Sequence, residues 1–184
     1  MKETSIIISG FGGQGTLFAG QLLAYAALDC DLHVTWIPSY GPEMRGGTAN
    51  CTVIISQEEI GSPLVSNPDV VIAMNLPSVD KYEPLLEKDG YLFVNQSLVP
   101  RQVDRKDINT IYVPAQELAE EMGNVRISNM VMIGALLELI DILPFDKVKK
   151  ALESHLPERH RKTLPMNYQA MEKGADHIRQ MVSQ

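Results

Sequence analysis

Glycine is concentrated in one short stretch near the start of this 184-residue chain, one residue after three consecutive isoleucines. The stretch reads Gly10-Phe11-Gly12-Gly13-Gln14-Gly15-Thr16, and a long apolar, alanine-rich segment follows it. Four glycines in six positions let the backbone turn sharply and let another molecule approach it closely. A helix that begins near Gln14 directs unpaired N–H groups and the positive end of its dipole toward this turn. The chemistry that the arrangement favours is the binding of an anion, most often a phosphate.

The glycine spacing that begins at Gly10, G-x-G-x-x-G, fits the fingerprint of dinucleotide-binding sites. That fingerprint also requires an acidic residue at the tip of the second strand, where it holds a ribose hydroxyl. Here the second expected strand, residues 32–37, is followed by Pro38, whereas Asp29 and Asp31 precede it. Three interpretations of the turn stay open: a dinucleotide site, a site for the phosphate of another ligand, which we favour, and glycines that only pack a helix against a strand.

A second loop, residues 39–48, is too rich in glycine and proline to be the interior of a helix or strand. Its candidate binding residues are Tyr40, Glu43, Met44, Arg45, Gly46 and Gly47. Loops that carry such residues between buried strands are commonly binding loops, and an ordinary turn with a surface ion pair is the alternative. If the first two strands are parallel neighbours, both loops leave the carboxyl edge of the sheet, where open α/β sheets bind ligands.

Apolar runs and turn signals predict the elements that position these loops. Strands are expected at residues 6–8, 32–37, 49–56, 69–74, 91–95 and 110–114. Helices are expected at residues 17–28, 78–86, 115–122, 129–143, 145–155 and 166–181, with Ser128 capping the fourth. This order indicates a single α/β domain over residues 1–184, with three layers (α/β/α), a mostly parallel sheet and a Rossmann-like, glycine-rich first turn.

The composition argues against several classes of function. The chain has 16 Lys and Arg against 23 Asp and Glu, and a net charge of −7 does not suit general nucleic-acid binding. Its longest apolar run, residues 130–137, is far shorter than the ~20 residues that span a bilayer. The first residues lead directly into a strand, so we expect no signal peptide, no membrane association and a cytoplasmic location.

The residues that commonly hold metals or attack substrates are sparse. Cys30 and Cys51 are the only cysteines, too few for a four-cysteine iron–sulfur cluster or a structural zinc site. We expect two buried, reduced thiols rather than a disulfide. The histidines, which show no metal-ligand spacing, are His33, His155, His160 and His177. The sequence therefore predicts no catalytic residue and no metal site.

A basic turn, residues 157–162, lies between the last two expected helices. Its side chains include Arg159, His160, Arg161 and Lys162. We interpret it as a solvated surface turn, and a contact with a phosphate or with a partner protein is the alternative.

The two glycine-containing loops together resemble the gamma subunit of 2-oxoacid:ferredoxin oxidoreductases. The resemblance rests on the glycine turn followed by the stretch from Tyr40 to Gly47, and it continues through residues 75–78, which begin with Asn75, and 129–134. It weakens after about residue 157. The uninterrupted stretch from Gly41 to Gly47 is most similar to the 2-oxoglutarate branch, while pyruvate, branched-chain and indolepyruvate enzymes stay open.

The resemblance implies one subunit of an enzyme that oxidatively decarboxylates a 2-oxoacid, takes up coenzyme A and passes electrons to ferredoxin. Thiamine diphosphate would sit between alpha and beta subunits, and iron–sulfur clusters in beta or a delta subunit, so this chain would hold neither. The gamma chain would contribute to binding coenzyme A as co-substrate and to assembly. The residues expected to bind it are Gly10, Gly12, Gly13, Gln14, Gly15, Thr16, Tyr40, Glu43, Met44, Arg45, Gly46, Gly47 and Asn75.

The partners implied are the alpha and beta subunits, and a delta subunit where the complex has one, with ferredoxin as the electron acceptor of the complex. We expect the isolated chain to be inactive and to form a homodimer through an exposed apolar surface, to which its nine methionines are suited. Two alternatives stay open: an autonomous dinucleotide-binding enzyme of Rossmann type, and a purely structural assembly subunit.

Overall fold

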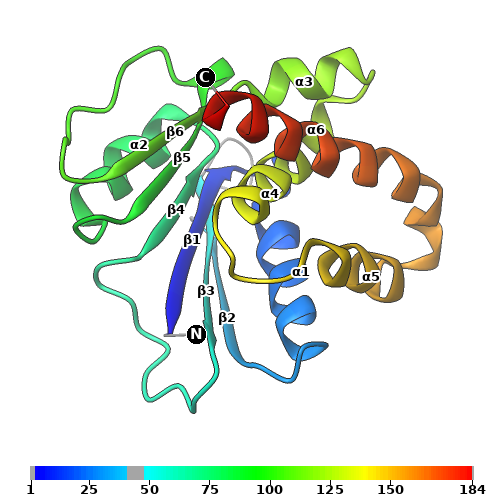
Figure 1. Ribbon diagram of the computed structural model, residues 1–184, viewed down its shortest axis with the longest axis horizontal. Coiled ribbons are helices and arrows are strands. Elements are labelled where there is room, and N and C mark those ends of the chain that lie inside the picture. The colour runs from blue at the N-terminus through cyan, green and yellow to red at the C-terminus, as the bar shows by residue number, and fades with distance from the viewer. Residues whose placement is uncertain (1–2, 41–47, 184) are drawn as a thin grey trace.

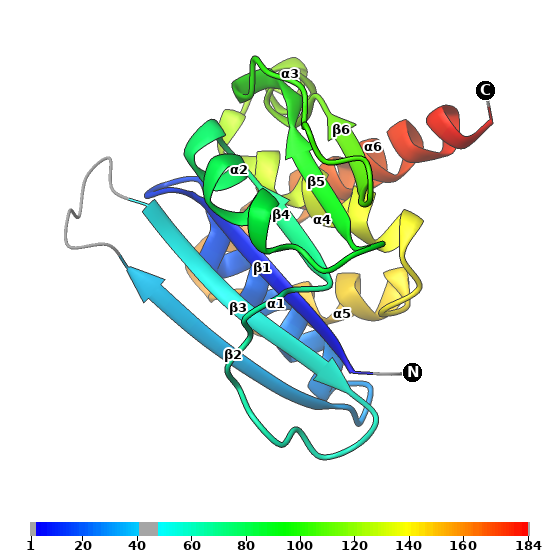
Figure 2. The same ribbon diagram turned by 90° about the vertical axis from the view of Figure 1, so that its left-hand side faces the viewer.

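The computed structural model describes residues 3–40 and 48–183, which form one six-stranded sheet with helices on both sides (Figure 1). The strands are β1 (Thr4–Phe11), β2 (His33–Tyr40), β3 (Thr48–Ser56), β4 (Val70–Ala73), β5 (Tyr91–Asn95) and β6 (Asn109–Val113). Their order across the sheet is β2-β3-β1-β4-β5-β6, which can be followed in Figure 2. Strands β1, β4, β5 and β6 pair in parallel, and only the pairs made by β3 are antiparallel.

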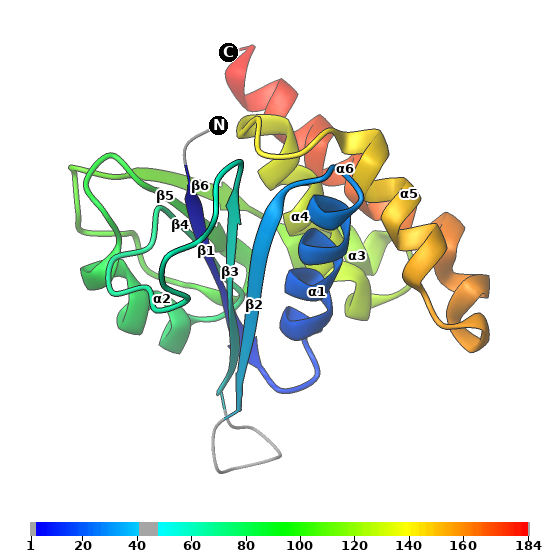
Figure 3. The ribbon, with the colours of Figure 1, turned by 90° about the horizontal axis from the view of Figure 1, so that it is seen from below.

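The helices lie in two layers (Figure 3). One face of the sheet carries α1 (Thr16–Leu28), α3 (Ala115–Glu121), α4 (Ser128–Leu139), α5 (Phe145–His155) and α6 (Leu164–Val182). The other carries α2 (Leu76–Tyr82), which the 3-10 turn η1 (Glu83–Leu85) extends. Ile6 and Ile8 pack in the core beneath the five helices, and Ile7 in the core beneath α2, because successive strand residues point to opposite faces. The predicted three-layer, mostly parallel α/β fold is confirmed.

The premise that the first two strands are parallel neighbours is wrong, because β3 lies between β1 and β2. Only residues 41–47 separate β2 from β3, fewer than the dozen or so residues of a parallel crossover, so the two strands pair antiparallel. The strand ends that precede the two loops nevertheless lie at the same edge of the sheet, as predicted. Phe11 is opposite Thr48, and Tyr40 is opposite Ala49, so β1 and β2 end at the same edge of the sheet.

The helix predicted at residues 129–143 differs from the structure at its end and in its cap. Helix α4 ends at Leu139 rather than at residue 143, and Ile140 is extended, with φ −119° and ψ 119°. The apolar pattern misleads here because Ile142 and Leu143 enter the core from the turn that follows the helix. Ser128 does not cap α4, since the 3-10 turn η3 (Val125–Ile127) leads directly into the helix and is itself capped by the side chain of Asn124.

Most of the methionines among the described residues are buried, so they give no support to the expected exposed apolar surface. Four of the nine are buried in the core, namely Met74, Met130, Met132 and Met171. Their flexible side chains fill irregular spaces between the sheet and the helices. Among residues 3–40 and 48–183, no helix combines the length and the apolar character needed to cross a membrane.

Candidate functional site

The glycine turn joins β1 to α1 at the edge where the parallel strands end. Gly13 and Gly15 have φ values of 98° and 71°, in the left-handed region that favours glycine. Gly15 is the N-cap residue of α1, and Gly12 and Gly13 are exposed. The backbone N–H groups of Gly12 and Gly13 donate to no acceptor within the described ranges. These two amides are therefore available to an anion at the positive end of α1.

Two of the glycines are required by packing within the chain. A Cβ atom at Gly10 would lie 2.6 Å from Gln14 Oε1 and 2.8 Å from the Cβ of Met74. A Cβ atom at Gly15 would overlap the side-chain amide of Asn129. At Gly13, by contrast, an added Cβ would meet nothing within 4 Å. Packing accounts for Gly10 and Gly15, and it leaves the exposed face of the turn at Gly13 open to another molecule.

The side chain of Gln14 folds back over the turn. Its Oε1 accepts a hydrogen bond of 2.6 Å from the backbone N–H of Phe11, and its Nε2 donates to the carbonyl of Met74 at 3.3 Å. Asn75 Nδ2 donates to the same Gln14 oxygen at 3.4 Å. Gln14 thus uses the innermost amide of the turn and ties the turn to the end of β4. The backbone amides of Gly12 and Gly13, on the outer side of the turn, remain available to a ligand.

Two further predicted binding residues have structural contacts behind the turn. Asn75 is 1% exposed and caps α2, since its Oδ1 accepts from the backbone N–H of Ser78 at 2.9 Å. Ser78 Oγ in turn donates to Asn75 Oδ1 at 2.7 Å and lies 2.9 Å from Ser9 Oγ. Thr16 is buried, and its hydroxyl lies 3.4 Å from the carbonyl of Ala49, to which it donates. These side chains hold β1, β3 and α2 together and so support the turn.

The second predicted loop falls mainly outside the described residues. Tyr40 is the last residue of β2, at the same edge of the sheet as the glycine turn. The predicted residues that lie outside the described ranges are Glu43, Met44, Arg45, Gly46 and Gly47.

The geometry does not support a ribose contact of the dinucleotide type. In that fold the strand beside the first one runs parallel to it and carries an acidic residue at its carboxyl end. Here the neighbour on that side is β3, which is antiparallel and therefore presents its first residues beside the turn. Those residues are Thr48, Ala49 and Asn50, none of which is acidic.

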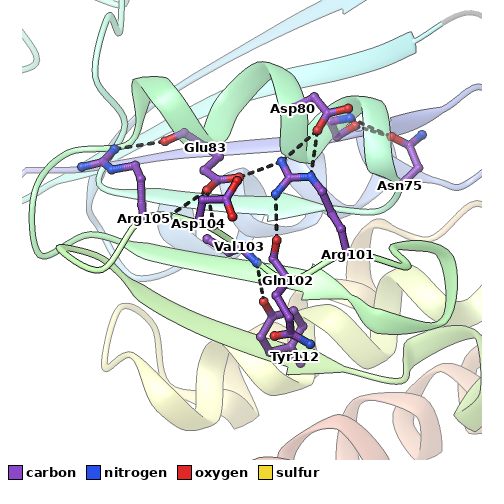
Figure 4. A network of polar contacts seen from close by, with 10 residues as sticks. Asn75, Asp80, Glu83, Arg101, Gln102, Val103, Asp104, Arg105 and Tyr112 are labelled. Atoms are coloured by element: carbon purple, nitrogen blue, oxygen red, sulfur yellow. Dashed lines mark hydrogen bonds and ion pairs between the residues drawn. The ribbon is translucent and has the colours of Figure 1, made fainter.

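A buried carboxylate on the other face was not predicted from the sequence (Figure 4). Glu83 is 5% exposed, and its carboxylate accepts from Arg101 Nη2 at 2.8 Å and from the backbone N–H groups of Asp104 and Arg105 at 2.8 and 3.2 Å. Burial alone would raise the pKa of Glu83, but these hydrogen bonds outweigh it and hold the pKa below 4.5. Arg101 also donates to Asp80 at 2.8 Å. The network fastens the segment before β6 to α2. Its partners are distant in sequence, so no local pattern could have indicated it.

The two cysteines are free. Cys51 is fully buried, its Sγ lies 3.4 Å from the carbonyl of Thr16, and burial raises the pKa of its thiol to about 11. Cys30 is only half-buried, so the expectation of two buried thiols holds for Cys51 alone. Within the described part of the chain, no three His, Cys, Asp or Glu side chains are grouped so as to hold a metal ion.

Comparison with known proteins gives a consistent result over almost the whole chain. Residues 5–177 match the family described as pyruvate ferredoxin/flavodoxin oxidoreductase. The ketoisovalerate oxidoreductase subunit VorA of Methanothermobacter marburgensis is 37% identical over 179 residues, which cover 97% of this chain and 37% of VorA. The 2-oxoglutarate synthase subunit KorC of the same organism is 37% identical over 172 residues, which cover 90% of this chain and 92% of KorC.

Solved structures share the fold. The gamma subunit of a keto/oxoacid ferredoxin oxidoreductase from Geobacter sulfurreducens superposes with a TM-score of 0.80 at 28% identity, over 95% of this chain and 98% of that one. A 2-oxoglutarate:ferredoxin oxidoreductase from Magnetococcus marinus, solved with 2-oxoglutarate, coenzyme A and succinyl-CoA, gives a TM-score of 0.88 at 24% identity, over 97% of this chain and 31% of that one. The latter comparison shows the fold alone. By its sequence match and its fold, the chain belongs to the pyruvate ferredoxin/flavodoxin oxidoreductase family.

Proposed function

We propose that the chain is the gamma-type subunit of a 2-oxoacid:ferredoxin oxidoreductase. The support is the family match, together with two relatives that it covers almost completely, KorC at 92% and the Geobacter gamma subunit at 98% of their lengths. VorA and KorC are both 37% identical to it, so identity does not choose between ketoisovalerate and 2-oxoglutarate. We favour 2-oxoglutarate because of the uninterrupted stretch from Gly41 to Gly47.

A role in binding coenzyme A is carried by one observation, the exposed N–H groups of Gly12 and Gly13 that have no acceptor among the described residues. Adjacent amides at the N-terminal end of α1 suit a phosphate oxygen, and coenzyme A brings a pyrophosphate. Bound coenzyme A supplies the thiol that takes up the acyl group. The part of this chain is to hold and orient the pyrophosphate through the turn, which Gln14 and Asn129 brace from behind.

The other cofactors belong to other chains in this proposal. Thiamine diphosphate lies between the alpha and beta subunits, and the iron–sulfur clusters lie in beta or delta subunits. Cys51 is buried, and its thiol contacts a backbone carbonyl. Cys30 is the other cysteine of the chain, and two thiols do not make up the four-cysteine ligand set of a cluster.

Purification from the native host through a tag on this chain tests the assignment. We expect alpha and beta chains, thiamine diphosphate and iron to travel with it, and the complex to reduce ferredoxin when it is given a 2-oxoacid and coenzyme A. A chain that is recovered alone, with no ferredoxin reduction on 2-oxoglutarate, ketoisovalerate, pyruvate or indolepyruvate, contradicts the proposal.

A matched pair of variants tests the coenzyme A site. Asn tolerates the positive φ of Gly13 better than most residues, and Asp has the same shape with a negative charge. We expect G13D to raise the apparent coenzyme A constant of the complex by about tenfold relative to G13N, with similar melting temperatures. Equal constants for the two variants would remove coenzyme A from this turn and leave the chain with a structural role in assembly.

A further inference from the structure

A hollow of about 240 Å³ lies between α1 and α5, outside the glycine turn. Its apolar wall is built by Phe18 and Leu22 from α1 and by Leu152 and Leu156 from the end of α5. Small-molecule pockets usually measure about 300–1,000 Å³, so this hollow suits a single bulky side chain better than a whole cofactor.

Contacts within α1 and between α1 and α5 fix the polar rim of the hollow. The rings of Tyr25 and His155 stack with their centroids 4.1 Å apart and their planes 10° from parallel. His155 Nε2 lies 3.4 Å from Asp29 Oδ2, and Gln21 Nε2 donates to the hydroxyl of Tyr25 at 3.1 Å. Because the hollow is formed before anything binds, an inserted side chain would have little structure to order.

An unpaired basic cluster adjoins this hollow. Pro157 lines it, and the next residues form the 3-10 turn η4 (Glu158–Thr163), where Arg159, Arg161 and Lys162 are exposed. Within the described ranges none of these three cations lies within ion-pair distance of a carboxylate. In contrast, the basic residues that do form such pairs with Asp or Glu are Arg101, Arg105, Lys149, Lys173 and Arg179.

We propose that the hollow and η4 together form a docking surface for an acidic segment of another protein chain. The segment inserts one bulky apolar side chain between α1 and α5 and places its carboxylates on Arg159, Arg161 and Lys162. Charge complementarity carries this choice of occupant, because a positive cluster with no carboxylate partner among the described residues, on a chain of net charge −7, attracts acidic segments selectively. A buried apolar anchor with a charged rim is also the usual anatomy of a binding hot spot. An inorganic phosphate would use the cations and leave the hollow unused.

The test uses the full chain and a fluorescein-labelled peptide with one phenylalanine between two runs of glutamates. We expect its binding, followed by fluorescence anisotropy, to weaken about tenfold when the phenylalanine is replaced by glycine, and to weaken with salt between about 0.05 M and 0.5 M. R161E with K162E should weaken binding about tenfold, as should Q21W, which fills the hollow. The control, K88E with K106E, makes the same charge change on exposed residues elsewhere and should change binding less than about twofold.

Equal binding of the phenylalanine and glycine peptides would overturn the proposal, and so would an equal effect of the two double charge reversals. Sedimentation of the wild-type chain gives a further check. A dimer that both Q21W and R161E/K162E dissociate would assign the surface to a second copy of this chain and overturn the acidic partner. None of these measurements needs coenzyme A or an active complex, so failure here leaves the proposed function intact.

Discussion

The side-chain amide of Asn129, near the start of α4, donates a hydrogen bond of 3.0 Å to the backbone carbonyl of Gly15, the N-cap residue of α1. The two residues are 114 positions apart in the sequence. Gly15 leaves just enough room for this amide, because any Cβ there would overlap it. The contact joins the glycine turn to the helical layer.

G15A should therefore destabilise the fold by about 2–4 kcal/mol, from the strained left-handed backbone and from overlap with Asn129. N129A should cost about 1–3 kcal/mol, because the carbonyl of Gly15 and the backbone N–H of Met130 each lose a partner. The double variant should cost clearly less than the sum of the two, because removal of the Asn129 amide relieves the overlap. Urea denaturation of the four proteins measures this coupling, and strict additivity would contradict the packing argument.

Q14A should lower the free energy of unfolding by about 1–3 kcal/mol, because the N–H of Phe11 and the carbonyl of Met74 each lose a partner. Q169A, a change at an exposed position of α6, is the control and should stay within about 0.5 kcal/mol of wild type. If the two variants unfold at the same urea concentration, the contacts of Gln14 do not brace the turn.

Glu83 should make stability depend on pH in the acid range. Its folded pKa is below the ordinary 4.5, so its contribution is present above 4.5 and is lost as the pH falls through the folded value. E83Q should be less stable than wild type at neutral pH, by about 1–3 kcal/mol, and should lose less stability on acidification. Thermal melts between neutral pH and about pH 3 check this, and parallel curves for the two proteins would contradict it.

The two thiols should react at different rates. Cys51 is fully buried and its pKa is raised to about 11, whereas Cys30 is half-buried. Because the thiolate is the reactive form, we expect a thiol reagent such as DTNB to modify Cys30 in the native protein and Cys51 only in denaturant. C30S should then show no rapid native reaction. Fast labelling of Cys51 in native C30S would show that the core opens readily around β3.

Arg45 lies outside the described residues, and the prediction for it comes from the sequence. A surface ion pair there would contribute less than ~1 kcal/mol, whereas a bidentate contact with a phosphate would contribute roughly 1.5–3 kcal/mol. R45K in the reconstituted complex should raise the apparent coenzyme A constant by about 10-fold or more with little change in melting temperature. An unchanged constant with weaker subunit association would assign Arg45 to a partner interface instead.

Much of the fold could be predicted because local signals coincide with it. Ile6–Ile8 and the glycines after them indicate a buried strand, a turn and a helix, and all three are present. The predicted end of α4 is too late for a physical reason. Ile142 and Leu143 are apolar because they pack in the core, although they lie beyond the end of the helix. Glu83 could not be identified from the sequence, because its partners Arg101 and Arg105 are 18 and 22 residues away and no periodic pattern relates them.

The sequence by itself determined the three-layer class, the family and the position of the glycine turn between β1 and α1, because strand hydrophobicity and glycine conformation are local properties. The tertiary structure decided how the glycines are used. Positions 10 and 15 require glycine because the side chains of Gln14, Met74 and Asn129 occupy the space that a Cβ atom would need. These contacts depend on how separate elements pack. It also placed β3 between β1 and β2, since strand pairing is a long-range choice that the residues of one strand do not encode.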